Sequence, residues 1–179
     1  MQISIIKKKF LLVGFEIAVD FNKGFAEEMM WIQSELKRSL ERIGNKTKPM
    51  RLVGFWQPWQ AFTMVPNPAS ASKAKYFFGV EVLNLDNVSS DCVVKVVPES
   101  EYAVYREERR GTAPKVEMYA VSGHEPNYEI AGDFEIFDDF DHLKEDDACD
   151  LLVPIKECTK YAFSTYVLKW FVNVKCTYF

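Results

Sequence analysis

KKFLLVGFEIAV is the stretch that decides the fold, and it occupies residues 8–19. Its side chains alternate along the chain, and one series is apolar throughout: Leu11, Val13, Phe15, Ile17 and Val19. A period of two predicts a β-strand, because successive side chains of an extended chain point to opposite faces. We expect this strand to run from Ile3 to Val19, with a break at the lysine run 7–9.

A helix is expected directly after this strand. Residues 22–24 read NKG and interrupt the alternation. Apolar side chains then return at helical spacing: Phe25, Met29, Ile32, Leu36, Leu40 and Ile43. Gly44 and Asn45 are suitable residues for the end of the helix. We expect Trp31 to pack this helix against the sheet.

The rest of the chain predicts further strands and a second, shorter helix. The expected strands are residues 51–59, 75–83, 92–97, 101–107, 134–137 and 150–155. The second helix is expected to begin at Thr112 and to end by Gly123. The order strand, helix, strand, strand therefore occurs twice. This order predicts an α+β fold in which antiparallel strands carry the helices on one face.

Composition and charge limit the classes of protein to which the chain can belong. The chain has 179 residues, 48% of them hydrophobic and 27% charged, which suits one domain in the usual range of roughly 100–200 residues. We expect residues 1–157 to form this domain and residues 158–179 to form an apolar C-terminal tail whose role stays open. The formal net charge is −4 and the pI is about 5.3. Since a nucleic-acid binder needs a basic face, no direct contact with nucleic acid is expected.

The cysteines and the N-terminus predict a compartment and exclude some cofactors. The four cysteines contain no C-x-x-C pair: Cys92, Cys149, Cys158 and Cys176. His124 and His142 are expected in loops, and with the cysteines they do not form the spacing typical of a zinc site. We therefore expect neither a metal site nor a cofactor. The first apolar residues precede the lysines, which is the reverse of a secretory signal. No segment is apolar enough over about 20 residues to span a bilayer. We expect a cytoplasmic protein with no membrane partner.

Six short sequence motifs follow one another within residues 5–156. They read KKFLLVGF at 8–15, WIQSEL at 31–36, YFFGVEV at 76–82, VPESEYAVY at 97–105, YEI with DFEIFD between 128 and 138, and DLLVPIK at 150–156. Together they resemble the GyrI-like effector-binding domain, which also forms the C-terminal half of some AraC-type and MerR-type regulators. The resemblance implies the SOUL/GyrI-like fold, with two βαββ modules related by a pseudo-twofold axis and a ligand cleft along their seam.

The resemblance also implies a ligand class and an acid that would hold it. Family ligands are often lipophilic cations, which aromatic faces and a desolvated carboxylate attract. In several members the acid is a glutamate of the closing strand, four residues before the proline. Asp150 occupies that position here, and its reach is one methylene shorter. Glu135 and Glu81 are the other candidate acids, and we expect at least one of the three to face the cleft.

Aromatic side chains would form the walls of the cleft. The candidates form one set: Phe55, Trp56, Trp59, Tyr76, Phe78, Tyr102 and Tyr105. Trp56 and Tyr102 are favoured, because rings with a polar edge suit such walls. Tyr105 is added to the predicted ligand-binding residues. Leu152 is added as well, because it lies two residues after Asp150 and so shares its strand face.

Three functions stay open from the sequence. The first is a stand-alone binding domain that senses or sequesters lipophilic, often cationic, compounds. The second is a hydrolase of electrophilic small molecules in the same cleft, which the resemblance implies for some members that use a glutamate and an aromatic hydroxyl. No nucleophile elbow or phosphate loop supports other chemistry. The third is binding to a protein partner such as DNA gyrase or a regulator, for which the acidic stretch 138–147 is a candidate docking face.

Overall fold

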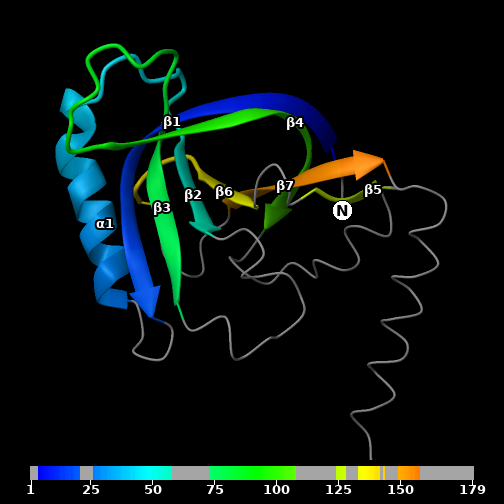
Figure 1. The fold of residues 1–179 in the computed structure, drawn as a ribbon, viewed down its shortest axis with the longest axis horizontal. Helices are drawn as coiled ribbons and strands as arrows, with labels where there is room; N and C mark the ends of the chain where they lie inside the picture. Colours follow the sequence, from blue (N-terminus) through cyan, green and yellow to red (C-terminus); the bar gives the residue numbers. More distant parts are fainter. Residues whose placement is uncertain are drawn as a thin grey trace, which may run out of the picture.

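The structure is a computed structural model that describes residues 4–20, 26–57, 73–107, 124–127, 133–141, 143 and 149–157. Its elements in chain order are β1 (Ser4–Asp20), α1 (Ala26–Ser39), the 3₁₀ turn η1 (Leu40–Arg42), β2 (Leu52–Gln57), β3 (Lys73–Glu81), β4 (Val93–Glu107), β5 (His124–Pro126), β6 (Phe134–Phe137) and β7 (Cys149–Glu157). A largely antiparallel sheet with a helix packed on it confirms the α+β class (Figure 1). The expected helix at 112–123, Trp59, His142 and the tail 158–179 lie outside the described residues.

Six of the strands pair into a closed ring. The order is β4-β1-β3-β2-β6-β7, and β7 pairs in turn with β4. Every pairing is antiparallel. The remaining strand, β5, pairs with the end of β7 from His124 opposite Glu157 to Pro126 opposite Ile155. A closed ring leaves few unpaired backbone groups, since most strands have a neighbour on both edges.

The inside of the ring is filled by a core to which all six strands contribute. Its residues are Phe10, Leu12, Val53, Phe55, Phe77, Val97, Tyr102, Phe134, Ile136 and Leu152. Aromatic rings make up its centre: Phe10 stacks on Phe134 at 4.7 Å, and Phe55 stacks on Phe77 at 4.9 Å between ring centroids. The alternation of side chains along each strand therefore sends one series into this inner core and the other to the outer face.

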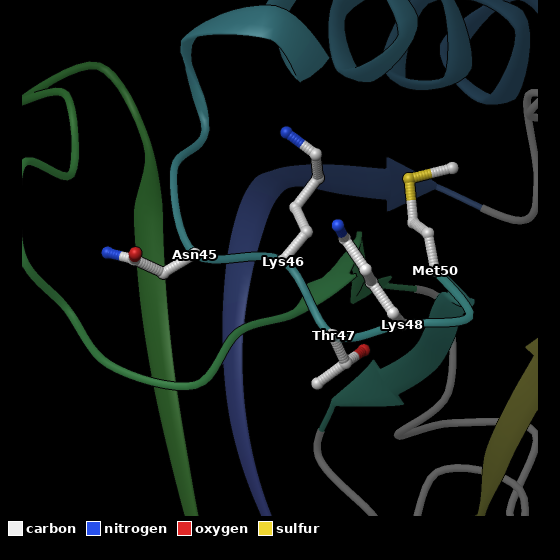
Figure 2. Close-up of a pocket in the computed structure, with 5 residues that line it drawn as sticks. All are labelled: Asn45, Lys46, Thr47, Lys48 and Met50. Carbon is white, nitrogen blue, oxygen red and sulfur yellow. The ribbon is translucent and has the colours of Figure 1, made fainter.

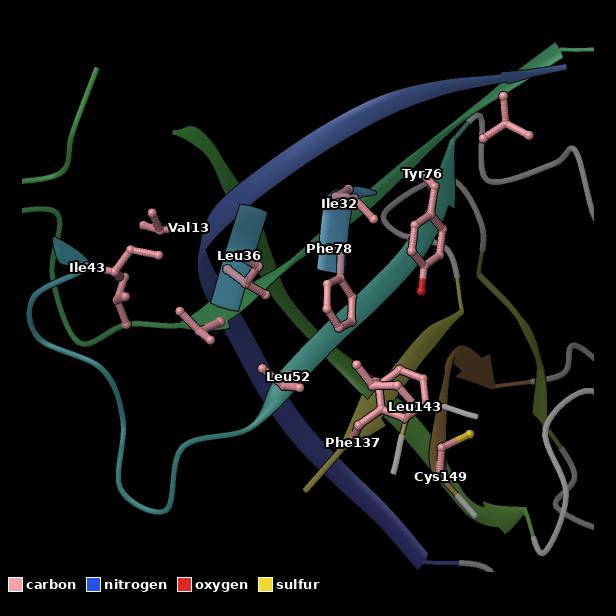
Figure 3. Packing of buried hydrophobic residues seen from close by; sticks show 13 residues of the cluster. Val13, Ile32, Leu36, Ile43, Leu52, Tyr76, Phe78, Phe137, Leu143 and Cys149 are labelled. Atoms are coloured by element: carbon pink, nitrogen blue, oxygen red, sulfur yellow. The ribbon is translucent and has the colours of Figure 1, made fainter. Parts of the chain in front are cut away.

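The outer face carries two further apolar clusters. Under α1 lie Val13, Leu52, Tyr76, Phe78, Val80 and Phe137, packed against Ile32 and Leu36 of the helix (Figure 3). On the other half of the ring lie Ala103, Tyr105, Leu151, Val153 and Ile155. The first cluster belongs mainly to β1, β3 and β2, and the second to β4 and β7. The strand β6 lies between them, next to β2 on one edge and β7 on the other.

The strand pairing has the order that two modules would give. The strands β1 to β3 pair in the order β1-β3-β2, and the other three strands of the ring pair in the order β4-β7-β6, while β1–β4 and β2–β6 join the two sets. Each strand of one set thus has a counterpart in the other. Because the second helix lies outside the described residues, the pseudo-twofold relation of two complete modules stays a prediction.

The end of α1 follows the sequence signals. The α-helix ends at Ser39, and η1 tightens the last turn. Asn45 adopts a left-handed φ of 56°, as expected for the stop after Ile43. The Lys46 ammonium donates to the carbonyl oxygens of Leu40 and Ile43. This lysine satisfies carbonyl groups that a helix end leaves without partners. Among the described residues, no helix has the length and apolar character needed to cross a bilayer.

Two expectations about the strands are wrong. β1 is unbroken, and the lysine run is instead the place where its register against β4 shifts, between Lys8 and Phe10. The two strands expected around Pro98 are one strand, β4. Pro98 and Glu99 lie opposite the single residue Lys9, since Val97 pairs with Phe10 and Ser100 with Lys8. A bulge of this kind accommodates a proline, which cannot donate to the ladder.

Two side chains also lie elsewhere than expected. Trp31 does not pack α1 on the sheet, because 51% of it is exposed and Ile32 and Leu36 take that role. His124 is in β5 and not in a loop. Contacts with distant parts of the chain explain both differences. The sheet packs against Ile32 and Leu36 of α1, and the pairing with Glu157 places His124 in a strand.

Alanine at Gly14 or Gly79 is expected to destabilise the ring. The two glycines are opposite each other in β1 and β3. A Cβ atom would lie 2.2 Å from the Phe78 carbonyl oxygen if placed on Gly14, and 2.5 Å from the Val13 carbonyl oxygen if placed on Gly79. Since these neighbours are backbone atoms, relief requires the strands to move apart. Each change should lower the free energy of unfolding by about 2–3 kcal/mol, as measured by urea denaturation.

Gly44→Ala is the matched control for these two variants. The nearest atom to a Cβ there is the Asp86 carbonyl oxygen at 3.9 Å, so the expected change is within about 0.5 kcal/mol. Equal losses at all three positions would contradict a close approach of β1 and β3 as the cause.

Candidate functional site

A hydrogen bond between a tyrosine and a glutamate joins the two halves of the outer face. The Tyr76 hydroxyl donates to Oε2 of Glu135 at 3.0 Å. Tyr76 is fully buried on β3 and Glu135 is partly buried on β6. Between these strands lies β2, in which Gly54 pairs with both Phe78 and Glu135. The bond therefore spans β2 and lies at the boundary between the two outer clusters.

Gly54 makes this reach across β2 possible. A Cβ atom on it would lie 2.0 Å from the Tyr76 hydroxyl oxygen and 3.5 Å from Oε2 of Glu135. Any larger residue would therefore displace the phenol from its place above the strand. Gly54 was not among the residues selected from the sequence. An isolated glycine within an apolar strand is a signal of close approach, and it could have identified this position.

Trp56 forms a wall beside this pair. It lies two residues after Gly54 on β2, so its side chain shares the outer face. The ring centroids of Trp56 and Tyr76 are 4.6 Å apart, and the two planes are inclined by 52°. Trp56 remains partly exposed, whereas Tyr76 is covered. A partly exposed indole on the same sheet face as a carboxylate is a suitable surface for a flat or cationic ligand.

Tyr105 extends the same face toward the second outer cluster. It pairs with Leu151 of β7, and Leu151 pairs with Glu135 of β6. Burial, and in addition the nearby Asp133 carboxylate, raise the pKa of Tyr105 to about 12. Asp133 precedes Glu135 by two residues and so projects to the same face of the chain. The structure thus brings Trp56, Tyr105 and Glu135 of the predicted set to one face, and adds Tyr76, Gly54 and Asp133.

Three other predicted residues lie on the inner side of the ring. Asp150 pairs with Ile136 and Arg106, and it shares its strand face with Leu152 as the spacing predicts. Leu152 and Tyr102 belong to the inner core. Burial raises the pKa of Tyr102 to about 12, and its hydroxyl has no hydrogen-bond partner within the described ranges. Asp150 and Glu135 therefore project from opposite faces of the sheet, and one ligand cannot use both.

The third candidate acid, Glu81, already has a cationic partner. The Lys8 ammonium donates to Oε2 of Glu81 at 2.7 Å. The same ammonium lies 4.7 Å from the centroid of the Phe10 ring. Lys8 and Glu81 are 73 residues apart in the chain, so their pairing depends on the register of the sheet. This ion pair supports a structural role for Glu81 at the rim of the ring.

A hollow of about 370 Å³ lies away from this cluster. It is formed by the loop between η1 and β2 and is lined by Asn45, Lys46, Thr47, Lys48 and Met50 (Figure 2). Lys46 uses its ammonium on the end of the helix, and the Thr47 backbone N–H donates to the Glu81 carbonyl oxygen. None of the predicted site residues lines the hollow. These bonds indicate that the hollow belongs to a structural turn. We therefore place the candidate site at Glu135 and not at the hollow. Of the acidic stretch 138–147, residues 142 and 144–147 are outside the described part.

Comparisons with known proteins agree with this architecture. The family model of Cass2, described as an integron-associated effector binding protein, matches residues 6–155. The cryo-EM structure of the EcmrR–DNA complex matches with a TM-score of 0.60 and 9% identity, covering 88% of this chain and 58% of that chain. The chain therefore spans little more than half of EcmrR. No curated protein matches the sequence.

Two further structures share the fold over nearly their whole length. SAV2435 bound to tetraphenylphosphonium matches with a TM-score of 0.52 and 16% identity, covering 87% of this chain and 94% of that chain. An integron cassette protein from Vibrio cholerae matches with a TM-score of 0.51 and 12% identity, covering 86% and 95%. At these identities the likeness shows the fold. It is the fold of small effector-binding domains.

Tyr76→Phe is expected to lower the free energy of unfolding by about 1–2 kcal/mol, because it removes a hydrogen bond to a partly buried carboxylate. Combined with Glu135→Gln in a double-mutant cycle, it should show a coupling energy of about 1 kcal/mol. Tyr102→Phe is the control, since its hydroxyl lies in the inner core and outside this bond. Independent effects of Tyr76→Phe and Glu135→Gln in urea denaturation would contradict the described interaction.

Proposed function

Because the chain belongs to the family of integron-associated effector binding proteins, we propose that it binds a lipophilic cation at Glu135, beside the ring of Trp56. The observation that carries this proposal is the 3.0 Å hydrogen bond from Tyr76 to Glu135 beside the accessible indole of Trp56. It orients a carboxylate at the boundary of the two outer clusters. The protein would thus sense or sequester its ligand.

The chemistry of the cluster favours a cation over a neutral or anionic ligand. A carboxylate in partly apolar surroundings stabilises an opposite charge more strongly than one in water. The tyrosine hydroxyl donates a hydrogen bond without adding a charge, so this bond leaves the negative charge of Glu135 in place. Aromatic faces attract cations through the quadrupole of the ring. The tetraphenylphosphonium bound by SAV2435 is a ligand of this class in a related fold.

Glu135 is a better candidate than the other two acids. Glu81 is engaged by Lys8. Asp150 projects to the inner side, where the ring is occupied by its own aromatic core. A ligand held by Asp150 would have to displace part of this core, whereas one at Glu135 lies against Trp56. A ligand role for Asp150, Leu152 or Tyr102 stays a prediction from the sequence.

Tetraphenylphosphonium should bind to the protein, and Glu135→Gln should weaken this binding by tenfold or more. A tenfold loss corresponds to about 1.4 kcal/mol of binding free energy, a modest value for a partly buried charge pair. Trp56→Leu should weaken binding by about fivefold through the loss of the cation–π contact. Isothermal titration calorimetry measures both effects. Triphenylphosphine oxide, a neutral analogue, should lose little affinity in Glu135→Gln.

Asp150→Asn is the matched control, since it removes the same charge from the opposite face. This variant should leave the affinity within about twofold of the parent, because the Asp150 carboxylate makes no contact with the proposed ligand. Loss of binding in Asp150→Asn with normal binding in Glu135→Gln would transfer the site to the inner face.

A second candidate function rests on the same pair of residues. A phenol and a carboxylate 3.0 Å apart can act as acid and base on a water molecule and a strained electrophilic ring. In that case the protein would convert an epoxide-type substrate in many-fold excess over its own concentration, and both Tyr76→Phe and Glu135→Gln would stop the conversion. Recovery of unchanged substrate after prolonged incubation would leave ligand binding as the function.

A further inference from the structure

The first half of β4 has a neighbour on one edge alone. Residues Val93 to Val97 pair with residues 10–14 of β1, whereas β7 pairs with β4 only from Glu101 onward. Within the described residues the second edge of this segment is therefore open. Its outer side chains are accessible: Val96 is 70% exposed and Val94 is 37% exposed. In Figure 1 this part of β4 runs along the rim of the ring near α1.

The backbone groups on this edge belong to the same two valines. The Leu11 carbonyl oxygen accepts a hydrogen bond from the Val82 N–H on the β3 side. The backbone N–H and C=O groups of successive residues point to alternate edges of a strand. Those of Phe10 and Leu12 therefore point toward β4. Their partners Val97 and Lys95 point back to β1. The N–H and C=O groups of Val94 and Val96 consequently point outward from the sheet.

The sequence of the segment is symmetric about Lys95. Residues 93–97 read VVKVV, so a second copy in antiparallel orientation meets the same sequence it presents. A twofold axis at Lys95 places Val94 of each copy opposite Val96 of the other copy. Both are outer-face residues with outward backbone groups, as a hydrogen-bonded antiparallel pair requires. A twofold axis makes such an interface self-complementary.

The charge of Lys95 does not oppose this approach. An exposed lysine commonly protects an edge strand from pairing. Here the Lys95 ammonium turns to the inner face, where it donates to Oε2 of Glu16 and, at 3.0 Å, to Oε1 of Gln57. Burial alone would raise the pKa of Glu16, but hydrogen bonds from Lys75 and Lys95 hold it below its usual value. Glu16 therefore stays ionised and holds the Lys95 ammonium on the inner face by an ion pair.

From these observations we propose that the chain forms a twofold dimer in which the β4 edges of two copies pair about Lys95. The partner is a second copy because the open segment is complementary to itself in sequence, hydrogen-bonding direction and exposed apolar side chains. Pro98, which has no N–H, limits the ladder to a few residues on each side. A short ladder buries far less than the roughly 1,200–2,000 Å² of a stable complex. The dimer is therefore in exchange with the monomer.

Sedimentation equilibrium over a wide range of protein concentration tests this dimer. The parent protein should show a reversible monomer–dimer equilibrium, and Val96→Lys should weaken it by tenfold or more, because it places a charge on the edge of each copy. Leu83→Lys is the matched control: Leu83 is 73% exposed but lies outside the edge segment, and it should leave the equilibrium unchanged. A monomer at every concentration up to about 1 mM, which corresponds to about −4 kcal/mol, would overturn the proposal.

Cysteine cross-linking tests the register. In the proposed pairing, Val94→Cys mixed with Val96→Cys should give a disulfide-linked dimer on mild oxidation, since opposed residues of a hydrogen-bonded pair lie within disulfide range. Each variant alone should stay uncross-linked and also controls for the native cysteines. Cross-linking of a single variant to the same extent as the mixture would overturn the axis at Lys95.

Discussion

A sheet that closes on itself must fill its inside and cover its outside, and this requirement governs the structure. The inner core takes one side chain in two from all six strands, and most of its volume is aromatic. Polar side chains therefore lie at the rims, at the outer boundary between the apolar clusters, or on parts of the inner face outside this core, as Lys95 and Glu16 do. Each carboxylate on the ring has to meet a partner at one of these places, because an uncompensated charge in such surroundings is costly. The positions of the acids follow from the closure of the ring.

Closure also explains the positions of three glycines. Gly14 and Gly79 lie opposite each other in β1 and β3, and a Cβ on either would meet backbone. Gly54 has a different effect, since it leaves room for a side chain and not for a strand. The phenol of Tyr76 occupies that room and reaches Glu135 on the far side of β2. One glycine thus converts two residues that are distant in sequence into a polar pair on an apolar face.

The sequence predicts the elements of this fold better than their neighbours. Alternation and helical spacing give β1 and α1, and the period of two places Glu135 opposite in direction to Phe134 and Ile136. Local pattern does not tell which face of a strand is the inside of a ring. That depends on pairings such as β2 with β6, which join residues some 80 positions apart. For the same reason Asp150 could be recognised as a candidate acid, while its direction away from Glu135 could not.

The partners of the acids explain why they are not equivalent for a ligand. Glu81 is held by Lys8, and Glu16 by Lys75 and Lys95, so the negative charge of each of these carboxylates is compensated by at least one ammonium. Glu135 is held by a phenol, and a hydrogen bond from a neutral donor orients a carboxylate without compensating its charge. The lysines therefore stabilise the fold, and the tyrosine orients the carboxylate of the proposed site. In the proposed site, a cation that approaches beside Trp56 gains the attraction of a carboxylate that this hydrogen bond orients. The bond from Tyr76 to Glu135 differs from the lysine bonds to Glu81 and Glu16 in having a neutral donor.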